Sequence, residues 1–183
     1  YIENNFYSEY CDNYLDKMRI SVAHEFFHAI QRSYRPDYNE DHDFLLEMSS
    51  MWFERLMVDN CSDYLTFTEK SSGIFKNPNQ AFDGSDINIS EQADFGYSMA
   101  LFGHYLSRIV DVNGANDEKN STIIRKIWEK YCYNSQSSDS SCPNNLSPRQ
   151  AIVHTIEEFG DSFSRVWSDF ISRNTLNGLY QYF

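Results

Sequence analysis

The chain has 183 residues, of which 41% are hydrophobic and 16% aromatic, enough for one globular domain with its own core. Its formal net charge of −12 argues against a nucleic-acid or anionic-membrane partner, because phosphate binding needs clustered Lys and Arg side chains. No run approaches the roughly 18 consecutive apolar residues of a transmembrane helix, so we expect no membrane span in this segment. The composition predicts a single domain over residues 1–183, and the opening on Tyr1 indicates a piece of a longer protein.

Three helices are predicted before residue 113, because apolar side chains recur there every three to four positions. The first runs from Leu15 to Tyr34, the second from about Asp41 to Asp59, and the third from about Glu91 to Val112. The stretch 71–90 contains Gly, Pro and Asn and is predicted to be a surface connection. The residues predicted to be buried are Met18, Val22, Phe26 and Ala29/Ile30 in the first helix, Leu45, Met48, Trp52 and Leu56 in the second, and Phe95, Met99, Phe102, Leu106 and Ile109 in the third.

Three more helices are predicted in the rest of the chain. One runs from Ser121 to Tyr133, one from a cap at Ser147 to Gly160, and the last from a cap at Asp161 to Asn174. Only "YIENNFY" at the start and "YLTFT" at 64–68 have strand-like composition. The sequence therefore predicts a mainly α fold with about six helices and at most a short N-terminal β element. The apolar residues predicted to be buried are Ile123, Ile124, Ile127, Trp128, Tyr131, Phe163, Val166, Trp167, Phe170 and Ile171.

The four cysteines contain no C-x-x-C pair, which disfavours a structural zinc site and leaves disulfides or free buried thiols. Cys132 and Cys142 bracket a polar, Ser-rich stretch, so a local disulfide is predicted there. That pairing leaves Cys11 with Cys61. Because disulfides persist in oxidising compartments, the pattern predicts a secreted or extracellular protein.

The strongest functional signal is the stretch HEFFH, from His24 to His28. On a helix these two histidines lie one turn apart on the same face, with Cβ atoms roughly 6 Å apart, so both rings can reach one zinc ion. Glu25 lies between them and can accept a proton from a zinc-bound water, which is the role of a general base. The motif arises by chance in about one such chain in a hundred, and a satisfied pair of structural histidines is the alternative.

A catalytic zinc site needs a third protein ligand. The metzincin continuation H-x-x-G-x-x-H fails, because position 31 is Gln and position 34 is Tyr. Glu47 lies on the second predicted helix, which the turn at Pro36 can fold back against the first. The predicted zinc site therefore consists of His24, His28 and Glu47.

The stretches HEFFHAIQ and EMSSMWFE resemble the gluzincin metallopeptidases of the thermolysin-like branch. Within that branch they are similar to a group of bacterial secreted metalloprotease-like proteins with the pattern H-E-F-F-H-A-x-Q and then E-x-x-A-x-W-x-E, and the likeness extends over most of the chain. The resemblance implies a zincin-like helical catalytic domain that hydrolyses peptide bonds. The roles that it implies are zinc ligands for His24, His28 and Glu47 and the base for Glu25, with Trp52 and Glu54 matching the rest of the second helix.

The chain departs from thermolysin in two respects. Thermolysin has an Asp four residues after its ligand Glu that orients a histidine, whereas here that position is Met51, so Ser50, Glu54 or Asp43 would have to substitute. Thermolysin-like enzymes also have an N-terminal sheet whose edge strand aligns the substrate. Only "YIENNFY" could represent that edge, so the sheet is either reduced or cut away from this segment.

Hydrolysis also needs a hydrogen-bond donor for the charge that develops on the carbonyl oxygen. Tyr97 and His104 lie seven residues apart on one face of the third predicted helix, and the family pattern favours Tyr97. An interface aromatic is the alternative for this tyrosine. His42 lies off the face of Glu47, and His154 is expected at the surface or in packing.

The leading hypothesis is a zinc-dependent endopeptidase that acts on a peptide or protein substrate. The alternative is a non-catalytic binding or scaffolding module that retains the zincin helices. A third reading is an intact zinc site that is disabled because the sheet that aligns the substrate has been cut away.

Overall fold

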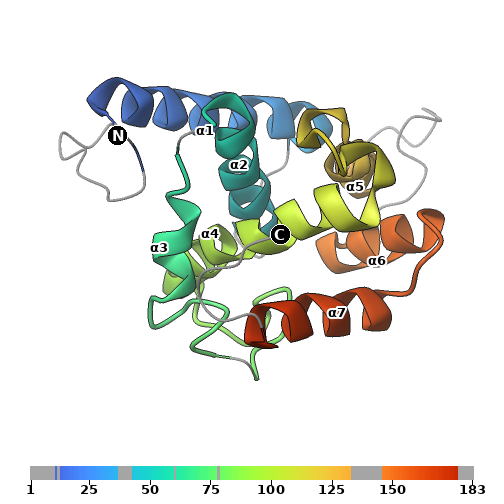
Figure 1. Cartoon of the computed structure of the whole chain (residues 1–183). Helices are drawn as coiled ribbons and strands as arrows, with labels where there is room; N and C mark the ends of the chain where they lie inside the picture. The colour runs from blue at the N-terminus through green and yellow to red at the C-terminus, as the bar shows by residue number, and fades with distance from the viewer. Residues whose placement is uncertain are drawn as a thin grey trace. The chain divides into compact units, whose positions relative to one another are not determined.

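The computed structural model describes residue 11 and residues 13–36, 43–59, 61–77, 79–132 and 146–176. These residues form seven α-helices and no strand, which confirms the predicted mainly α class (Figure 1). The chain divides into two compact units, residues 1–103 and 104–183. None of the described helices has the length and hydrophobicity needed to cross a bilayer. The helices are α1 (Tyr14–Tyr34), α2 (Asp43–Met57), α3 (Tyr64–Thr68), α4 (Ile89–Tyr105), α5 (Ile123–Tyr131), α6 (Pro148–Glu158) and α7 (Phe163–Leu176).

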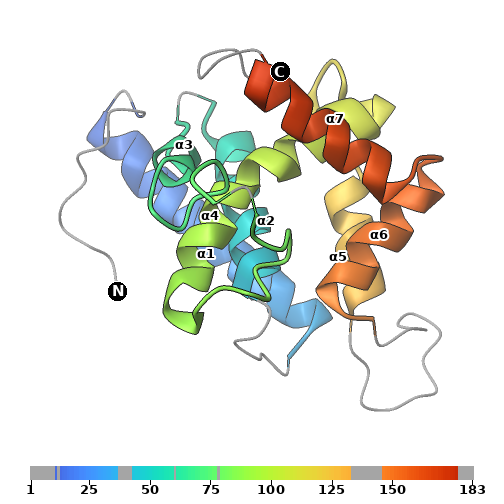
Figure 2. The ribbon, with the colours of Figure 1, turned by 90° about the horizontal axis from the view of Figure 1, so that it is seen from below.

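Helices α1 and α2 pack against each other in the first unit (Figures 1 and 2). The face of α1 predicted to be buried is wrong, because Met18, Val22 and Phe26 are 42%, 58% and 59% exposed. The face that packs carries the two histidines of the motif and Gln31 together with apolar side chains, so α1 has apolar residues on both its packed and its exposed face. This differs from the usual amphipathic arrangement, in which the exposed face is polar. The buried residues of α1 are Asp16, Lys17, Ile20, Ala23, Phe27 and Gln31.

Two glycines of α4 face α2. A Cβ atom added at Gly96 would stand 2.8 Å from the Cβ of Glu47 and 2.9 Å from the Cα of Phe44, closer than real Cβ atoms approach. At Gly103 the nearest heavy atom would be the Cβ of Trp52 at 3.4 Å, an ordinary contact. The missing side chain at Gly96 therefore allows α4 to lie directly against the turn of α2 that carries Glu47. Around this contact the predicted core residues Leu45, Met48, Trp52, Phe95, Met99 and Phe102 are buried.

The segment Tyr64–Thr68, predicted as strand-like from its composition, forms the short helix α3, so that prediction is wrong. A strand of five residues needs a neighbouring strand to bond with, and the described residues offer none. The other strand-like stretch, "YIENNFY", lies outside the described residues. The connection 71–90 is also less exposed than predicted, since Ile74, Phe82 and Ile87 are buried.

The second unit contains α5, α6 and α7 (Figure 2). Helix α6 begins with a capping box, in which the Ser147 side chain accepts from the Gln150 backbone and the Gln150 side chain accepts from the Ser147 backbone. Gly160 follows α6 with φ of +84°, a conformation that favours glycine. Of the predicted core, Ile123, Ile124, Ile127, Trp128, Tyr131, Val166 and Phe170 are buried, whereas Phe163, Trp167 and Ile171 are half-buried.

Cys11 and Cys61 form the predicted disulfide, which joins the start of α1 to the segment after α2. The bond packs beside Ile20 and Val58. It spans a sequence separation of 50 residues, for which loop entropy alone gives a stabilisation of about 4 kcal/mol. Cys132 is also disulfide-bonded, whereas its predicted partner Cys142 lies outside the described residues.

Candidate metal centre

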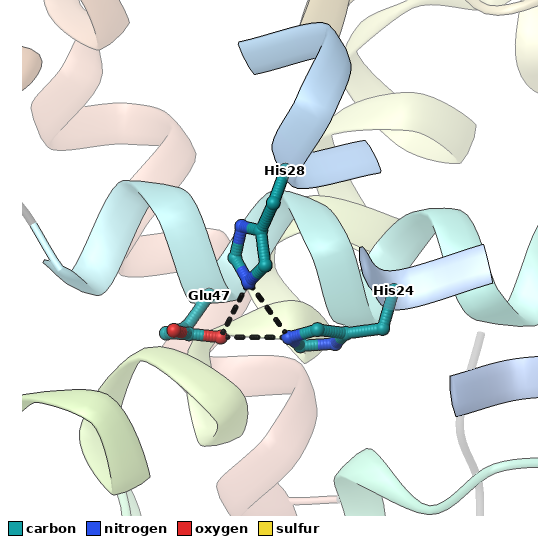
Figure 3. A group of neighbouring side chains, drawn as sticks. All are labelled: His24, His28 and Glu47. Carbon is teal, nitrogen blue, oxygen red and sulfur yellow. Dashed lines mark hydrogen bonds and ion pairs between the residues drawn. The ribbon is translucent and has the colours of Figure 1, made fainter. Parts of the chain in front are cut away.

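Three side chains from two helices bring their donor atoms together (Figure 3). His24 and His28 project from α1 and Glu47 projects from α2. His24 Nε2 lies 3.0 Å from both His28 Nε2 and Glu47 Oε2, and His28 Nε2 lies 3.6 Å from Glu47 Oε2. Among the His, Cys, Asp and Glu side chains that the structure describes, these three are the ones whose donor atoms lie close enough together to hold a metal ion.

Glu54 orients His24. Its Oε1 lies 2.6 Å from His24 Nδ1, and because an ionised carboxylate only accepts, Nδ1 is the donor. The Nε2 of His24 then keeps its lone pair, which faces Glu47. Burial raises the pKa of Glu54 to about 7 against the opposing hydrogen bond from His24, so the ionised form dominates above neutral pH. A carboxylate behind a ligand histidine is a recurring part of protein metal sites, since it fixes the ring and makes it a better ligand.

His28 is oriented by an amide instead of a carboxylate. Its Nδ1 lies 2.7 Å from Gln31 Oε1 and 3.2 Å from Ser50 Oγ. Since an amide oxygen only accepts, Nδ1 of His28 carries the proton and Nε2 keeps the lone pair. When both rings are neutral, the two histidines therefore present the lone pairs of their Nε2 atoms to the same point.

When both imidazoles are neutral, none of the three inward-facing atoms (His24 Nε2, His28 Nε2 and Glu47 Oε2) carries a hydrogen, so none can donate a hydrogen bond to another. Glu47 Oε2 is buried, and neutral histidines would leave it without a donor. Without a cation, a proton takes this place: burial opposes the charge on His24, but hydrogen bonds to Glu47 and Glu54 outweigh it and raise the pKa of His24 to about 10. A metal ion would satisfy all three atoms at once, so the residues fit a metal ion.

The predicted base and the predicted oxyanion donor both lie beside this group. Glu25 stands between the two histidines on α1 with an exposed side chain. Tyr97 of α4 is half-buried, with its ring centroid 6.0 Å from that of His24. Burial raises the pKa of Tyr97, and the nearby negative charges, including those of Glu47 and Glu25, raise it further. The phenol therefore stays protonated and can donate its hydrogen.

Of the three side chains predicted to replace the aspartate of thermolysin, two contact the histidines. Glu54 contacts His24 and Ser50 contacts His28. The side chain of Asp43 lies outside what the structure describes. Met51, at the position equivalent to that aspartate, is buried in the core.

The remaining histidines take no part in this group. His104 belongs to the second unit, where its Nδ1 lies 2.7 Å from Glu118 Oε1. His154 is exposed, as predicted, and its Nδ1 lies 3.3 Å from Glu157. His42 lies outside the described residues.

Gln31 is the site residue to which the sequence analysis assigned no role, although it breaks the metzincin motif and closes the HEFFHAIQ stretch that carries the family resemblance. A signal was present, because a residue three positions after His28 lies on the same face of a helix. Polar side chains on that face are candidates for supporting a ligand.

Comparisons of the chain with protein-family models, with curated proteins and with solved structures found no match. The functional interpretation therefore depends on the geometry and chemistry of the site. That geometry brings together two imidazoles and one carboxylate that could hold a metal ion, with the exposed Glu25 next to His24 in the chain and the protonated phenol of Tyr97 nearby.

Proposed function

We propose that the protein is a zinc-dependent peptide hydrolase of the gluzincin kind. The observation that carries the proposal is the convergence of the Nε2 atoms of His24 and His28 with a buried carboxylate oxygen of Glu47. Each ring uses its Nδ1 for a supporting partner, Glu54 or Gln31, so the neutral rings leave both Nε2 lone pairs for an ion. A structural pair that keeps a proton at His24 Nε2 is the alternative, and metal analysis distinguishes the two.

Zinc fits this donor set better than other common ions. Two imidazoles and one carboxylate form the ligand set of catalytic zinc sites, which keep a fourth position open. Ligands about 2.0–2.2 Å from a tetrahedral ion lie roughly 3.3–3.5 Å from one another. The three separations of 3.0, 3.0 and 3.6 Å bracket that value, so binding requires only small movements of the side chains.

In the proposed reaction, zinc supplies a Lewis acid that makes water a nucleophile near neutral pH. Glu25 accepts the proton of the attacking water and passes it to the amine that leaves when the peptide bond breaks. Tyr97 donates its O–H to the carbonyl oxygen as negative charge develops there. Glu54 and Gln31 keep the two histidine rings in place throughout.

The proposed location is outside the cell or in another oxidising compartment. The Cys11–Cys61 disulfide supports it, because such bonds are rare in reducing compartments. A peptide or protein is the proposed substrate, which follows from the reaction class and not from a described substrate pocket.

The decisive experiment is Glu25→Gln in the zinc-loaded protein, assayed on an unstructured protein substrate. We expect hydrolysis to fall by about 10²–10⁴-fold, the usual contribution of a general base, with about one zinc per chain retained. Glu129→Gln is the matched control, because Glu129 is an exposed glutamate on α5, in the second unit. Undiminished hydrolysis by Glu25→Gln, or absence of metal in protein never exposed to chelator, would contradict the proposal.

Metal analysis of Glu47→Ala tests the third ligand. Removing one of three ligands should abolish tight zinc binding, since two imidazoles alone form a weak site. Tight zinc retained in that variant would mean that the gluzincin ligand set is wrong.

A non-catalytic binding module is the second candidate. It is favoured by the exposed apolar stripe of α1, where Leu15, Val22 and Phe26 are 48%, 58% and 59% exposed, since apolar surface of this kind commonly marks an interaction site. Zinc-loaded protein that cleaves no unstructured substrate, but binds a partner less well after Val22→Asp, would favour this function over hydrolysis.

A further inference from the structure

Gln31 is the most deeply buried polar side chain of α1, with 1% of its surface exposed. A buried amide is costly unless both of its ends are hydrogen-bonded. Its oxygen lies 2.7 Å from His28 Nδ1, on its own helix. Its nitrogen faces α2, where it lies 2.9 Å from the Leu46 carbonyl, 3.0 Å from Ser49 Oγ and 3.0 Å from Ser50 Oγ.

The direction of the amide follows from these contacts. The Leu46 carbonyl can only accept a hydrogen bond, so the amide nitrogen must face it. Ser49 Oγ donates to the Leu45 carbonyl at 2.6 Å and thus has a lone pair left for the same nitrogen. The amide oxygen is therefore the end that faces His28, and a flipped amide would set two acceptors against each other at the Leu46 carbonyl.

The partners of the amide on α2 flank the third ligand. Leu46 directly precedes Glu47, and Ser49 and Ser50 follow it by two and three positions. One side chain therefore contacts a ligand histidine on α1 and the backbone turn that carries the ligand carboxylate on α2.

We propose that Gln31 is a positioning residue of the metal centre, which directs the Nε2 lone pair of His28 toward the ion and sets the spacing between His28 and Glu47. The proposal rests on the metal site of the proposed function. Gln31 does not touch substrate or ion in this scheme, and it acts through its neighbours.

The first test compares Gln31→Leu with Thr155→Val in Co²⁺ binding, measured by visible absorption and by competition with a chelator. Gln31→Leu keeps nearly the same volume but loses every hydrogen bond, so we expect about 10–100-fold weaker binding and an altered Co²⁺ absorption spectrum. Thr155→Val removes a buried side-chain hydrogen bond of α6 in the second unit, and it should bind within about threefold of wild type with an unchanged spectrum. A merely structural role would lower the unfolding temperature of the metal-free protein without changing the Co²⁺ spectrum.

Gln31→Glu tests the orientation of His28 separately from the spacing between His28 and Glu47. It also keeps the proposal testable when Gln31→Leu fails to fold. One carboxylate oxygen can still accept from His28, so the Co²⁺ spectrum should match that of wild type. The other oxygen faces the Leu46 carbonyl, so the ion should leave about tenfold faster in chelator. A wild-type release rate in Gln31→Glu, or wild-type affinity and spectrum in Gln31→Leu, would overturn the role of Gln31.

Failure of this inference is distinguishable from failure of the proposed function. Wild-type protein that binds neither Zn²⁺ nor Co²⁺ would refute the metal centre itself. Wild-type protein that binds tightly, together with a Gln31→Leu variant that binds equally well, would refute only the positioning role.

Discussion

The α1–α2 pair of the first unit buries a polar network among its apolar residues, whereas the α5–α6 pair of the second buries almost only apolar side chains. Helices α5 and α6 bury mainly Ile, Trp and Ala, and their buried Thr155 bonds back to the Ala151 carbonyl of its own helix. Helices α1 and α2 also bury apolar side chains, but Gln31, two serines and Glu54 lie among them and bond to one another and to the histidines. The first pair therefore combines an apolar contact with a polar arrangement that orients two histidines.

The contrast has an energetic meaning. Apolar burial stabilises a fold by roughly 25 cal/mol per Å², but a buried polar network at best offsets its own desolvation. The polar network of the α1–α2 pair should therefore add little stability of its own, and the Cys11–Cys61 disulfide and, in the proposed function, a metal ion would supplement the apolar contact. Three predictions test the contrast, from the largest expected effect to the smallest.

Ile127→Ala should have the largest effect on stability and none on the metal. Ile127 is fully buried on α5, so its truncation should lower the free energy of unfolding by about 2–5 kcal/mol through lost burial and a residual cavity. Zinc affinity should stay within about threefold of wild type. Urea denaturation and chelator competition measure the two quantities. A loss of zinc affinity of about tenfold or more would show that the two regions are coupled and would remove the contrast.

Gly96→Ala and Gly103→Ala form a matched pair on α4. The first inserts a Cβ against Glu47 and the backbone of Phe44, so we expect a loss of about 1–3 kcal/mol in stability and about tenfold weaker zinc binding. At Gly103 there is room for the added Cβ, so Gly103→Ala should leave the stability unchanged or raise it by up to about 1 kcal/mol, because Ala has a higher helix propensity than Gly. Equal effects of the two substitutions on zinc binding would contradict the placement of Glu47 by the contact at Gly96.

The smallest effect is a pH dependence of the metal-free protein. The pKa of His24 is raised from 6.5 to about 10 and that of Glu54 from 4.5 to about 7. Between the two pKa values of each group, the folded state binds more protons than the unfolded state, so stability falls as the pH rises. The stability that His24 contributes is fully present below pH 6.5 and is lost as the pH rises toward 10. The contribution of Glu54 is fully present below pH 4.5 and is lost as the pH rises through 7.

Thermal unfolding across this pH range measures the effect, and the difference between wild type and His24→Gln isolates the site from other carboxylates. Because zinc must displace the His24 proton, the stabilisation by zinc should grow as the pH rises. A wild-type protein that gains stability with pH relative to His24→Gln would contradict the assigned proton.

Sequence reasoning located the site better than it located the packing. The spacing of His24 and His28 predicts a shared helix face, and Glu47 follows from the need for a third ligand on the next helix; the structure brings all three together. Helix positions were also predictable, because capping at Ser147 and apolar periodicity in α5 act through local contacts.

The face of α1 was not predictable from hydrophobicity. Hydrophobic periodicity predicts that Val22 and Phe26 are buried, because apolar residues usually lie in the core. They are exposed instead, because the opposite face of α1, with the histidines and Gln31, packs against α2. The prediction of a strand at Tyr64–Thr68 was wrong for a related reason, because residues with high β propensity form a strand only where another strand is available to pair with. In both places a tertiary requirement overrode the local pattern.

The Cys11–Cys61 disulfide has a consequence for how the protein survives damage. The ligands His24, His28 and Glu47 and their supports Gln31, Ser50 and Glu54 all lie within the covalent loop that this bond closes. A single break of the backbone in the connection between α1 and α2 would leave every one of these residues in one covalently joined molecule. Where a protease cuts this connection, the two halves of the candidate centre therefore remain tethered, whereas the same cut would separate them in an unbridged chain.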